Sequence, residues 1–414
     1  MLQSLLPRAH DKVRTLPLLG AIAEGFDDWL IASGYTLTSR RCAIHMLTHV
    51  DAALRRRHSG DIASLTHEAI HASWRDLMKV FPNGAGTALS VERYLITAAV
   101  LTAGGSAPAS ASSRAVVLSE EYADHLRDVR GFAASTVSHH RYAAHCFLDH
   151  LRTKETPLDS LQAKDIEGYI GQVGKRISRA SLQHEVAVVR GLLRYLATDG
   201  RAPVGVDRQI DTPRLYQMEK LPRALPWDLV IELLKSIDTG SAMGLRDYTM
   251  LLMIATYGLR ASEVVAITLD DISWRQGRLR VHQCKTSAPL ELPLTNEVLD
   301  ALVRHLKCTP PPAPYRRIFL RMRAPMGLLK PTAIVEVFQS AVRHSGLKIP
   351  LQGAHCLRHS LAVHLLKNGT PLKTIGDILG HRTAQSTSVY LRLATGDLRE
   401  VSLAVPGIRA KGGQ

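Results

Sequence analysis

Apolar residues recur at helical spacing over most of the chain. Residues 181–197 (SLQHEVAVVRGLLRYLA) form one amphipathic helical pattern, and the apolar positions between Val137 and Leu151 form another, with Ser135 and Thr136 as its expected N-cap. The stretches DLVIELLKSI and YTMLLMIATYGL are apolar enough to be buried helices. The pattern therefore predicts a largely helical protein.

The last third of the chain adds a short break in that pattern. RLRVHQ and LELPL alternate polar and apolar residues on either side of the polar CKTSAP, which predicts a β-hairpin over residues 278–294. Helical spacing returns over residues 331–345, 358–368 and 371–379. The expected fold class is mainly α with a small antiparallel β-sheet, that is, an α+β C-terminal domain preceded by helical domains.

Two stretches of small residues and proline divide the chain. TAGGSAPASASSRA at 102–115 carries too little apolar surface to fold, and prolines are dense between 201 and 226. The predicted organisation is a helical domain at 1–101, a linker at 102–115, a helical domain at 116–200, a linker at 201–223, a C-terminal domain at 224–405 and a flexible tail at 406–414.

A faint internal repeat relates the first two domains. Features of the first domain recur about 97 residues later: Gly34-Tyr35, Leu54 and Ser64-Leu65 correspond to Gly131-Phe132, Leu151 and Ser160-Leu161. Residues 1–101 are therefore interpreted as a divergent copy of residues 116–200, although helical hairpins also resemble one another by chance.

Composition and charge narrow the class of partner. The chain has 414 residues, enough for two or three domains, and a net charge of +15. Such a surplus favours nucleic acid, because bound Lys and Arg release the counterions condensed on it. A basic but merely solvated surface is the plainer explanation of the charge.

The five cysteines are odd in number and far apart, and no C-x-x-C occurs, so neither a disulfide framework nor a cysteine-based zinc site is expected. The charged N-terminus does not match a signal peptide, and no apolar run of membrane-spanning length is present. A cytoplasmic protein without a membrane association is expected.

Four short motifs in the last third carry candidate chemistry. Arg260 in ATYGLRASE follows a helix that Gly258 can end, at the start of a helix that Ser262 can cap, where a phosphate is favoured. Lys285 lies at the turn of the predicted hairpin. The others are His355-Cys356-Leu357-Arg358-His359, Gly380-His381, and Tyr390 nine residues further on.

Each motif alone has an ordinary structural explanation: a surface salt bridge, a solvated lysine, a chance His-x-x-Arg, or a tyrosine packed in a helix. Their residue types nevertheless suit one chemistry. A guanidinium can hold two phosphate oxygens, an imidazole moves a proton near neutral pH, and a tyrosine needs cations around the phosphate that it attacks.

Taken in order and spacing, the set closely resembles the tyrosine recombinase (phage integrase) family, of the kind found in mobile genetic elements. The flanking stretches LPRALPWDLVIELL, YGLRASEVVAITLDDI and LRHSLAVHLLKNGTPLKTIGDILGH agree, and the resemblance covers about residues 116–405. It implies a C-shaped DNA clamp in which a core-binding (SAM-like) domain, here 116–200, faces the catalytic domain across double-stranded DNA.

The resemblance also implies the roles of the site residues. Arg260 and Arg358 would hold the scissile phosphate, Tyr390 would form a 3′-phosphotyrosyl bond, and Lys285 would protonate the leaving 5′ oxygen. His355 would accept the phenol proton, His381 would donate a hydrogen bond to a phosphate oxygen, and Glu263 and His359 would support these residues from behind. No metal or other cofactor is needed, because the phosphotyrosine conserves the bond energy.

The family usually acts as a tetramer on two DNA sites, so a homo- or hetero-tetramer with partner recombinases is expected, and residues 397–405 could dock on a neighbour. Three rival classes stay open. A type IB topoisomerase would use a similar tyrosine, a DNA-binding protein could carry an inactive site, and His67-Glu68-Ala69-Ile70-His71 formally matches the H-E-x-x-H of zinc metalloproteases.

Overall fold

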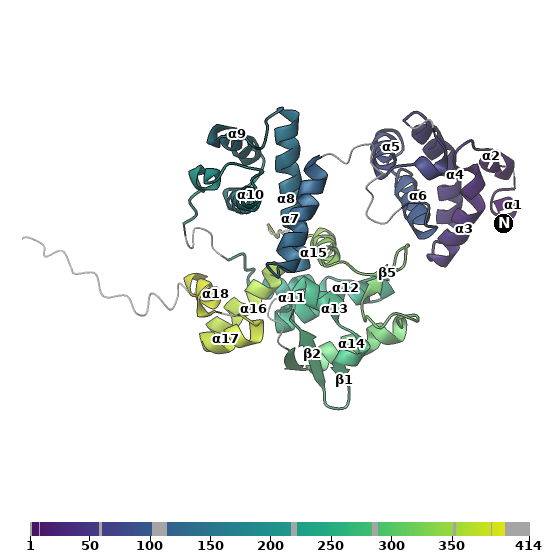
Figure 1. The fold of residues 1–414 in the computed structure, drawn as a ribbon. Coiled ribbons are helices and arrows are strands. Elements are labelled where there is room, and N and C mark those ends of the chain that lie inside the picture. Colours follow the sequence, from purple (N-terminus) through teal and green to yellow (C-terminus); the bar gives the residue numbers. More distant parts are fainter. Residues whose placement is uncertain are drawn as a thin grey trace, which may run out of the picture. The chain divides into compact units, whose positions relative to one another are not determined.

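The computed structural model describes residues 2–7, 9–57, 60–101, 114–216, 222–283, 289–350, 353–381 and 383–393. The chain divides into two compact units, one holding residues 27–41 and 220–414 and the other residues 2–26 and 42–219. Helices dominate, with two small antiparallel sheets in the C-terminal part, and the expected fold class is confirmed (Figure 1).

The described residues up to 101 are helical. They form α1 (Leu2–Leu5), α2 (His10–Arg14), α3 (Ala23–Ala32), α4 (Leu37–Arg55), α5 (His67–Val80) and α6 (Gly86–Thr97), with single turns η1 (Gly20–Ile22) and η2 (Ile62–Ser64). A buried carboxylate links two of these segments: Oδ1 of Asp51 on α4 accepts the backbone N–H groups of Leu18 and Leu19 at 2.9 and 2.8 Å.

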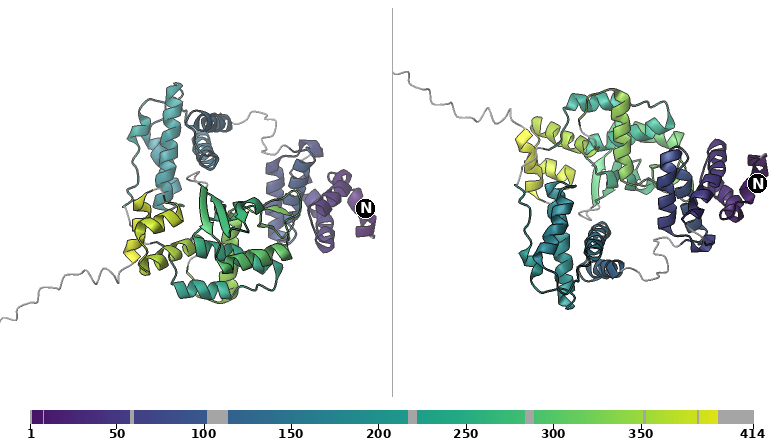
Figure 2. Two further views of the ribbon diagram at one scale, coloured as in Figure 1. Left: turned by 90° about the horizontal axis from the view of Figure 1, so that it is seen from below. Right: turned by 90° about the horizontal axis from the view of Figure 1, so that it is seen from above.

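A second helical group follows residues 102–113, which lie outside the described residues. It comprises α7 (Arg114–Asp128), α8 (Ala134–Thr153), α9 (Ala163–Gly174), α10 (Arg179–Thr198) and η3 (Val206–Gln209). Helices α7 and α8 lie side by side in both figures, and α10 packs on α8 and α9 (Figures 1 and 2). Together these helices enclose one apolar core that contains Phe147 and Leu192.

Two details of this group differ from the sequence prediction. The predicted N-cap of α8 is wrong. The helix begins at Ala134, and its N-cap Ala133 makes no side-chain hydrogen bond, so Ser135 and Thr136 lie in the first turn. The segment interpreted as a linker from residue 201 also packs on the group, because Ala202, Val206 and Ile210 are buried in the same core. The helical group therefore extends to Ile210.

The C-terminal part contains most of the short elements. Its helices are α11 (Trp227–Lys235), α12 (Ala242–Tyr257), α13 (Ala261–Ala266), α14 (Asn296–Cys308), α15 (Thr332–Ser345), α16 (His355–Lys367), α17 (Leu372–Leu379) and α18 (Ala384–Ser388), with turns η4 (Leu269–Asp271) and η5 (Val389–Leu393). Its strands are β1 (Ile272–Ser273), β2 (Arg278–His282), β3 (Pro289–Pro293), β4 (Leu320–Arg321) and β5 (Gly327–Leu328).

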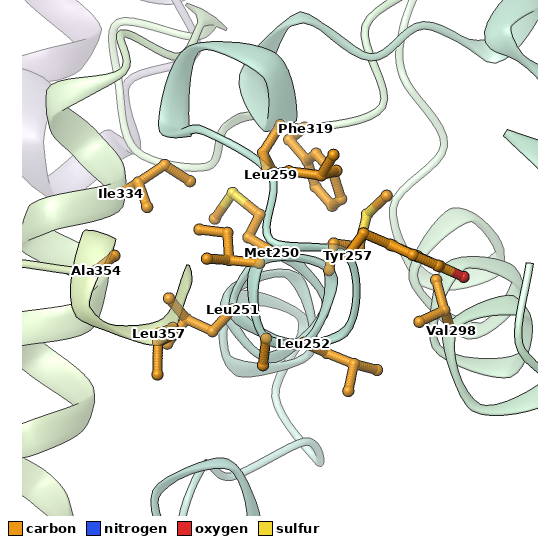
Figure 3. Close-up of a cluster of buried hydrophobic side chains, with 14 of the residues drawn as sticks. Met250, Leu251, Leu252, Tyr257, Leu259, Val298, Phe319, Ile334, Ala354 and Leu357 are labelled. Atoms are coloured by element: carbon orange, nitrogen blue, oxygen red, sulfur yellow. The ribbon is translucent and has the colours of Figure 1, made fainter. Parts of the chain in front are cut away.

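Helix α12 is the centre of this part. It is apolar on nearly all sides, and it packs against α11, α13, α14, α15 and α16. Met250, Leu251 and Leu252 of this helix point toward different neighbours in Figure 3, where Val298 of α14 and Leu357 of α16 face it. Each fully buried side chain of this size stabilises the fold by about 1.5–3 kcal/mol, so α12 fixes the frame on which the site is built.

The β-hairpin predicted for residues 278–294 is confirmed in its strands. Strand β2 pairs with β3 from Arg278↔Pro293 to His282↔Pro289, and β1 pairs with the other edge of β2. Leu279 and Val281 of β2 are buried while Arg278, Arg280 and His282 are exposed, as the alternation requires. The turn between the strands, with Lys285, lies outside the described residues.

None of the described helices has the length and apolar character that a membrane span requires.

Candidate active site

The first part of the site is the corner between α12 and α13. Gly258 ends α12 with φ +65°, and its sterically free backbone lets the chain turn at once into α13. Arg260, and not the expected Ser262, occupies the N-cap of α13. Glu263 accepts the Arg260 backbone N–H and a guanidinium N–H, both at 2.7 Å, so the arginine is fixed at the helix start.

The second part is the first turn of α16, which carries the His-x-x-Arg motif. Arg358 is only 3% exposed, and its guanidinium donates hydrogen bonds to the backbone carbonyls of Gly258 and Leu379. Burial and, to a smaller degree, the charge of Arg260 lower the pKa of Arg358 to about 10, so the group stays cationic at neutral pH. His355 is exposed, so the two residues differ in burial although they share a helical turn.

The third part is the loop after α17. Gly380 adopts φ +60°, and its carbonyl accepts a hydrogen bond from Arg260 at 3.3 Å. The next residue, His381, lies 2.9 Å from Thr387 through its Nδ1. Burial and the charge of Arg358 lower the pKa of His381 to about 4, so its imidazole is neutral at physiological pH.

The fourth part is Tyr390 in η5. Its side chain is 1% exposed, and its hydroxyl lies 2.9 Å from Nδ1 of His359 on α16. Burial lowers the pKa of His359 to about 4, and an imidazole that is neutral and protonated on Nε2 accepts the phenol proton in a hydrogen bond at Nδ1. His355 contacts His359 edge to face with ring centroids 4.5 Å apart, and the His381 ring lies parallel to the Tyr390 ring at 6.3 Å.

Two opposing effects act on the Tyr390 phenol. Burial raises its pKa, and the positive charge of Arg358 lowers it. The net pKa stays above the ordinary value, so the phenol is protonated at neutral pH and needs a neighbouring base to act as a nucleophile.

The described residues thus bring seven of the eight predicted site residues together from four segments. Arg260 and Glu263 come from the α12–α13 corner, the His355–His359 turn from α16, His381 from the loop after α17, and Tyr390 from η5, with contacts linking neighbouring parts. The hydroxyl of Tyr390 contacts His359 in this arrangement, whereas His355 was the predicted proton acceptor.

Sequence reasoning missed Gln283, which directly follows β2 and is buried at 6% exposure. Its side-chain amide lies against Gly380, so closely that a Cβ on the glycine would be 2.0 Å from Gln283 Nε2. The signal available in the sequence was its place at the end of a predicted strand, two residues before Lys285. Thr387, the hydrogen-bond partner of His381, had no signal of its own.

The H-E-x-x-H stretch folds as the start of α5 with Thr66 as its N-cap. His67 and His71 both lie beside the same carboxylate oxygen, Oε1 of Glu92 on α6, at 2.6 and 3.0 Å. Within the described ranges, no group of three or more His, Cys, Asp or Glu side chains is arranged to hold a metal ion. The metalloprotease interpretation finds no support here.

Comparison with known proteins identifies the family of this chain. Residues 224–396 match the model of the Phage integrase family, and residues 119–200 match that of the phage integrase N-terminal SAM-like domain. A protein of Sinorhizobium fredii described as an integrase/recombinase, y4rA, is 30% identical over 92% of this chain and 93% of its own length. The tyrosine recombinase XerD of Listeria monocytogenes is 30% identical over 69% of this chain and 96% of its own.

Solved structures share the fold. The XerH site-specific recombinase bound to palindromic difH substrate matches 74% of this chain and 92% of its own with a TM-score of 0.55 at 16% identity. The Tn1549 transposon integrase in complex with transposon right end DNA matches 69% and 99% with a TM-score of 0.53 at 16% identity. The chain belongs to the phage integrase family of tyrosine recombinases, enzymes that cut and rejoin DNA at specific sites through a tyrosine.

Proposed function

We propose that this chain binds double-stranded DNA, cleaves one strand with Tyr390 and rejoins it to a new partner strand. The observation that carries the proposal is the position of the Tyr390 hydroxyl, which contacts a neutral imidazole beside the buried cation Arg358. Basic charge of +15 over the chain suits the polyanionic substrate.

In the proposed step, the Tyr390 oxygen forms a bond to the scissile phosphorus while the bond from phosphorus to the 5′ oxygen breaks. The product is a 3′-phosphotyrosine and a free 5′-hydroxyl. Arg260 and Arg358 bind the non-bridging oxygens and stabilise the charge of the pentacoordinate transition state, and His381 donates a hydrogen bond to the same group. Lys285 supplies the proton to the leaving 5′ oxygen.

The phenol proton has a defined route. His359 is the imidazole in contact with the hydroxyl, and His355 lies beside it at the exposed end of the pair. We assign His359 as the acceptor in this conformation and His355 as the neighbour that carries the proton toward solvent. Glu263 holds Arg260 without neutralising Arg358, so one positive charge stays available for the phosphate.

The burial of Tyr390 adds a condition. Only 1% of the side chain is exposed, so a phosphate cannot reach the phenol until the segment Thr383–Leu393 shifts. We assign this shift to DNA binding and assembly. The structures of the matched XerH and Tn1549 proteins contain DNA. A lambda integrase fragment, which matches this chain at 18% identity and a TM-score of 0.52, was solved as a dimer bound to a core site. A tetramer on two DNA sites is the corresponding assembly here, acting in the cytoplasm.

Covalent trapping tests the proposal. Nicked duplexes from the genomic flanks of the gene should accumulate a protein–DNA adduct with the wild-type chain and none with Tyr390→Phe, whose duplex affinity stays within about twofold because it lacks only one hydroxyl. An adduct in Tyr390→Phe would overturn the choice of nucleophile. Relaxation of any supercoiled plasmid without sequence preference would favour a topoisomerase instead.

A matched pair of variants tests the proton route. His359→Ala should lower adduct formation more than His355→Ala, because only His359 contacts the hydroxyl. If His355→Ala has the larger effect and His359→Ala is nearly active, the acceptor is His355 and the contact seen with His359 belongs to the unbound enzyme.

A further inference from the structure

The helices α3–α6 repeat the helices α7–α10 in order. The second helix of each set, α4 and α8, has 19 and 20 residues, and each set has a shorter third helix followed by a fourth helix that returns to pack on the set. Before these second helices stand Gly34 and Gly131, 97 residues apart, both with positive φ (+81° and +62°). Helix order alone is weak evidence for a duplication, whereas buried positions that correspond in register are strong evidence.

The buried positions of the two sets coincide helix by helix. The first helices agree at an offset of 96, the second at 97, the third at 96 and the fourth at 101. The corresponding buried residues are Leu19/Ala115, Phe26/Tyr122, Leu30/Leu126, Leu47/Ala144, Val50/Phe147, Leu54/Leu151, Leu65/Leu161, Ile70/Ile166, Ala88/Val189, Val91/Leu192, Leu95/Leu196 and Leu101/Ala202. The offset changes only in the loops between helices, as insertions and deletions do in related domains.

One ring contact repeats as well. Phe26 and Tyr94 pack with centroids 5.7 Å apart, and Tyr122 and Tyr195 pack at 5.5 Å. These pairs join the first helix to the fourth in each set, and they stand at the same offsets of 96 and 101 that the buried positions give. A contact between two distant helices that recurs in register is not expected from chance similarity of helical hairpins.

Exposed cations also recur, although packing does not require them. Arg57 corresponds to Lys154 and Lys79 to Lys175, at the offsets of their helices, and all four are exposed. Because the packing of the helices does not require these cations, retained charge at equivalent exposed positions indicates a shared ligand. For a family whose substrate is DNA, that ligand is phosphate.

In the first set, the recurring cations meet in a groove. A hollow of about 680 Å³ between the ends of α4 and α5 is lined by Arg56, Arg57 and Lys79. The tilted rings of His49 and Phe81, with centroids 4.5 Å apart, also line it. Asp76 pairs with Arg57 and Lys79 and offsets one charge, which leaves the groove net positive. Cations beside a partly exposed ring are typical of surfaces that bind a nucleic-acid backbone.

We propose that residues 19–101 are a second copy of the helical domain at 115–202, and that this copy binds the phosphate backbone of duplex DNA through Arg57 and Lys79. It extends the contact of the enzyme to a second segment of the duplex. The proposal goes beyond cleavage at Tyr390, which needs no residue of this copy.

The test uses the full-length chain and two duplexes that share one cleavage site, a short one limited to the core and a long one extended on both sides. Arg57→Gln with Lys79→Gln removes the two cations, and Lys12→Gln with Arg75→Gln removes two exposed cations that have no counterpart in the second set. Thermal unfolding first checks that both double variants fold.

On the long duplex, the groove variant should lose about 1.8 units of the slope of log K against log salt, since each phosphate contact contributes about 0.9. That corresponds to about a thirtyfold loss of affinity at 0.15 M salt. The control variant should keep both values, and the hydroxyl-radical footprint of the groove variant should shorten. Adduct formation on the short duplex should be unchanged, so a failure here is separable from a failure of the Tyr390 proposal.

Two results would overturn the inference. Equal salt slopes for the groove and control variants would show that Arg57 and Lys79 do not contact phosphate. Unchanged slopes together with a loss of self-association in sedimentation would show that the groove binds another protein chain instead of DNA.

Discussion

Gly380 is the position where the site is most sensitive to one added carbon. Its φ of +60° lies in the left-handed region, where a residue with a side chain costs about 1–2 kcal/mol more than glycine. A Cβ there would lie 2.0 Å from Nε2 and 2.5 Å from Oε1 of Gln283, well inside contact distance. Gly380→Ala therefore forces either Gln283 or the loop after α17 to move.

The end of α17 and the loop after it carry two contacts of the site and one further site residue. The Gly380 carbonyl accepts from Arg260, the Leu379 carbonyl accepts from Arg358, and His381 follows directly. A shift of this loop would misplace the donors that we propose for the phosphate, and the loss of one such donor lowers a rate by about 10²–10³. We expect adduct formation by Gly380→Ala on a nicked duplex to fall at least a hundredfold, by about that estimate, with little change in DNA affinity.

Gly346→Ala is the matched control. Gly346 also follows a helix in the left-handed region, at φ +70°, but a Cβ there meets nothing within 4 Å. It should lose about the same 1–2 kcal/mol of stability and keep its cleavage rate. A second variant, Gly380→Ala with Gln283→Ala, removes the clash and should recover part of the rate. If Gly380→Ala cleaves as fast as Gly346→Ala, the packing of Gln283 on the loop does not position the site.

Three further outcomes follow from the same contacts. Arg358→Lys should lower adduct formation at least a hundredfold, which is about the loss expected for one donor. The reason is that a single ammonium cannot bridge the two carbonyls that hold the guanidinium. Single-turnover trapping measures this loss. With the pKa of His359 and His381 at about 4, the cleavage rate should be flat through neutral pH and fall only as the pH approaches 4. The pKa of both histidines in the folded chain lies below the unfolded value of about 6.5, so between these values the unfolded chain binds more protons than the folded chain. Thermal stability should therefore fall as the pH drops from about 6.5 to 4. His359→Asn should reduce that loss.

The sequence predicted the fold class and the strand pairing because both depend on local periodicity. Alternation in RLRVHQ and LELPL places residues on two faces of a sheet whatever surrounds it, and the strands formed as expected. The N-cap of α8 was mispredicted because the backbone conformation before the helix, and not the type of side chain, determines which residue is the N-cap. Gly131 at φ +62° and the extended Ala133 start the helix before Ser135.

The site shows a sharper limit. His355, Arg358 and His359 lie within one turn of α16, so helical spacing alone cannot decide which of them faces the tyrosine. That choice depends on where η5 packs on α16, and the packing puts the Tyr390 hydroxyl against His359. The sequence did not predict Gln283 as a site residue for the same reason, since its role depends on its contact with Gly380, nearly a hundred residues later in the chain.

The way Arg358 is held explains why so deeply buried a cation suits this chemistry. Its two hydrogen-bond acceptors, the carbonyls of Gly258 and Leu379, stand at the C-terminal ends of α12 and α17, where the helix dipoles carry partial negative charge. Among the described residues no salt bridge joins Arg358 to a carboxylate, whereas Arg260 is paired with Glu263. Two helix ends orient the guanidinium without cancelling its charge. In the mechanism that we propose, a carboxylate in their place would stabilise the unbound enzyme and leave less net charge for the transition state. The observed arrangement suits that mechanism, because Arg260 is fixed by a carboxylate and Arg358 is held by two helix ends.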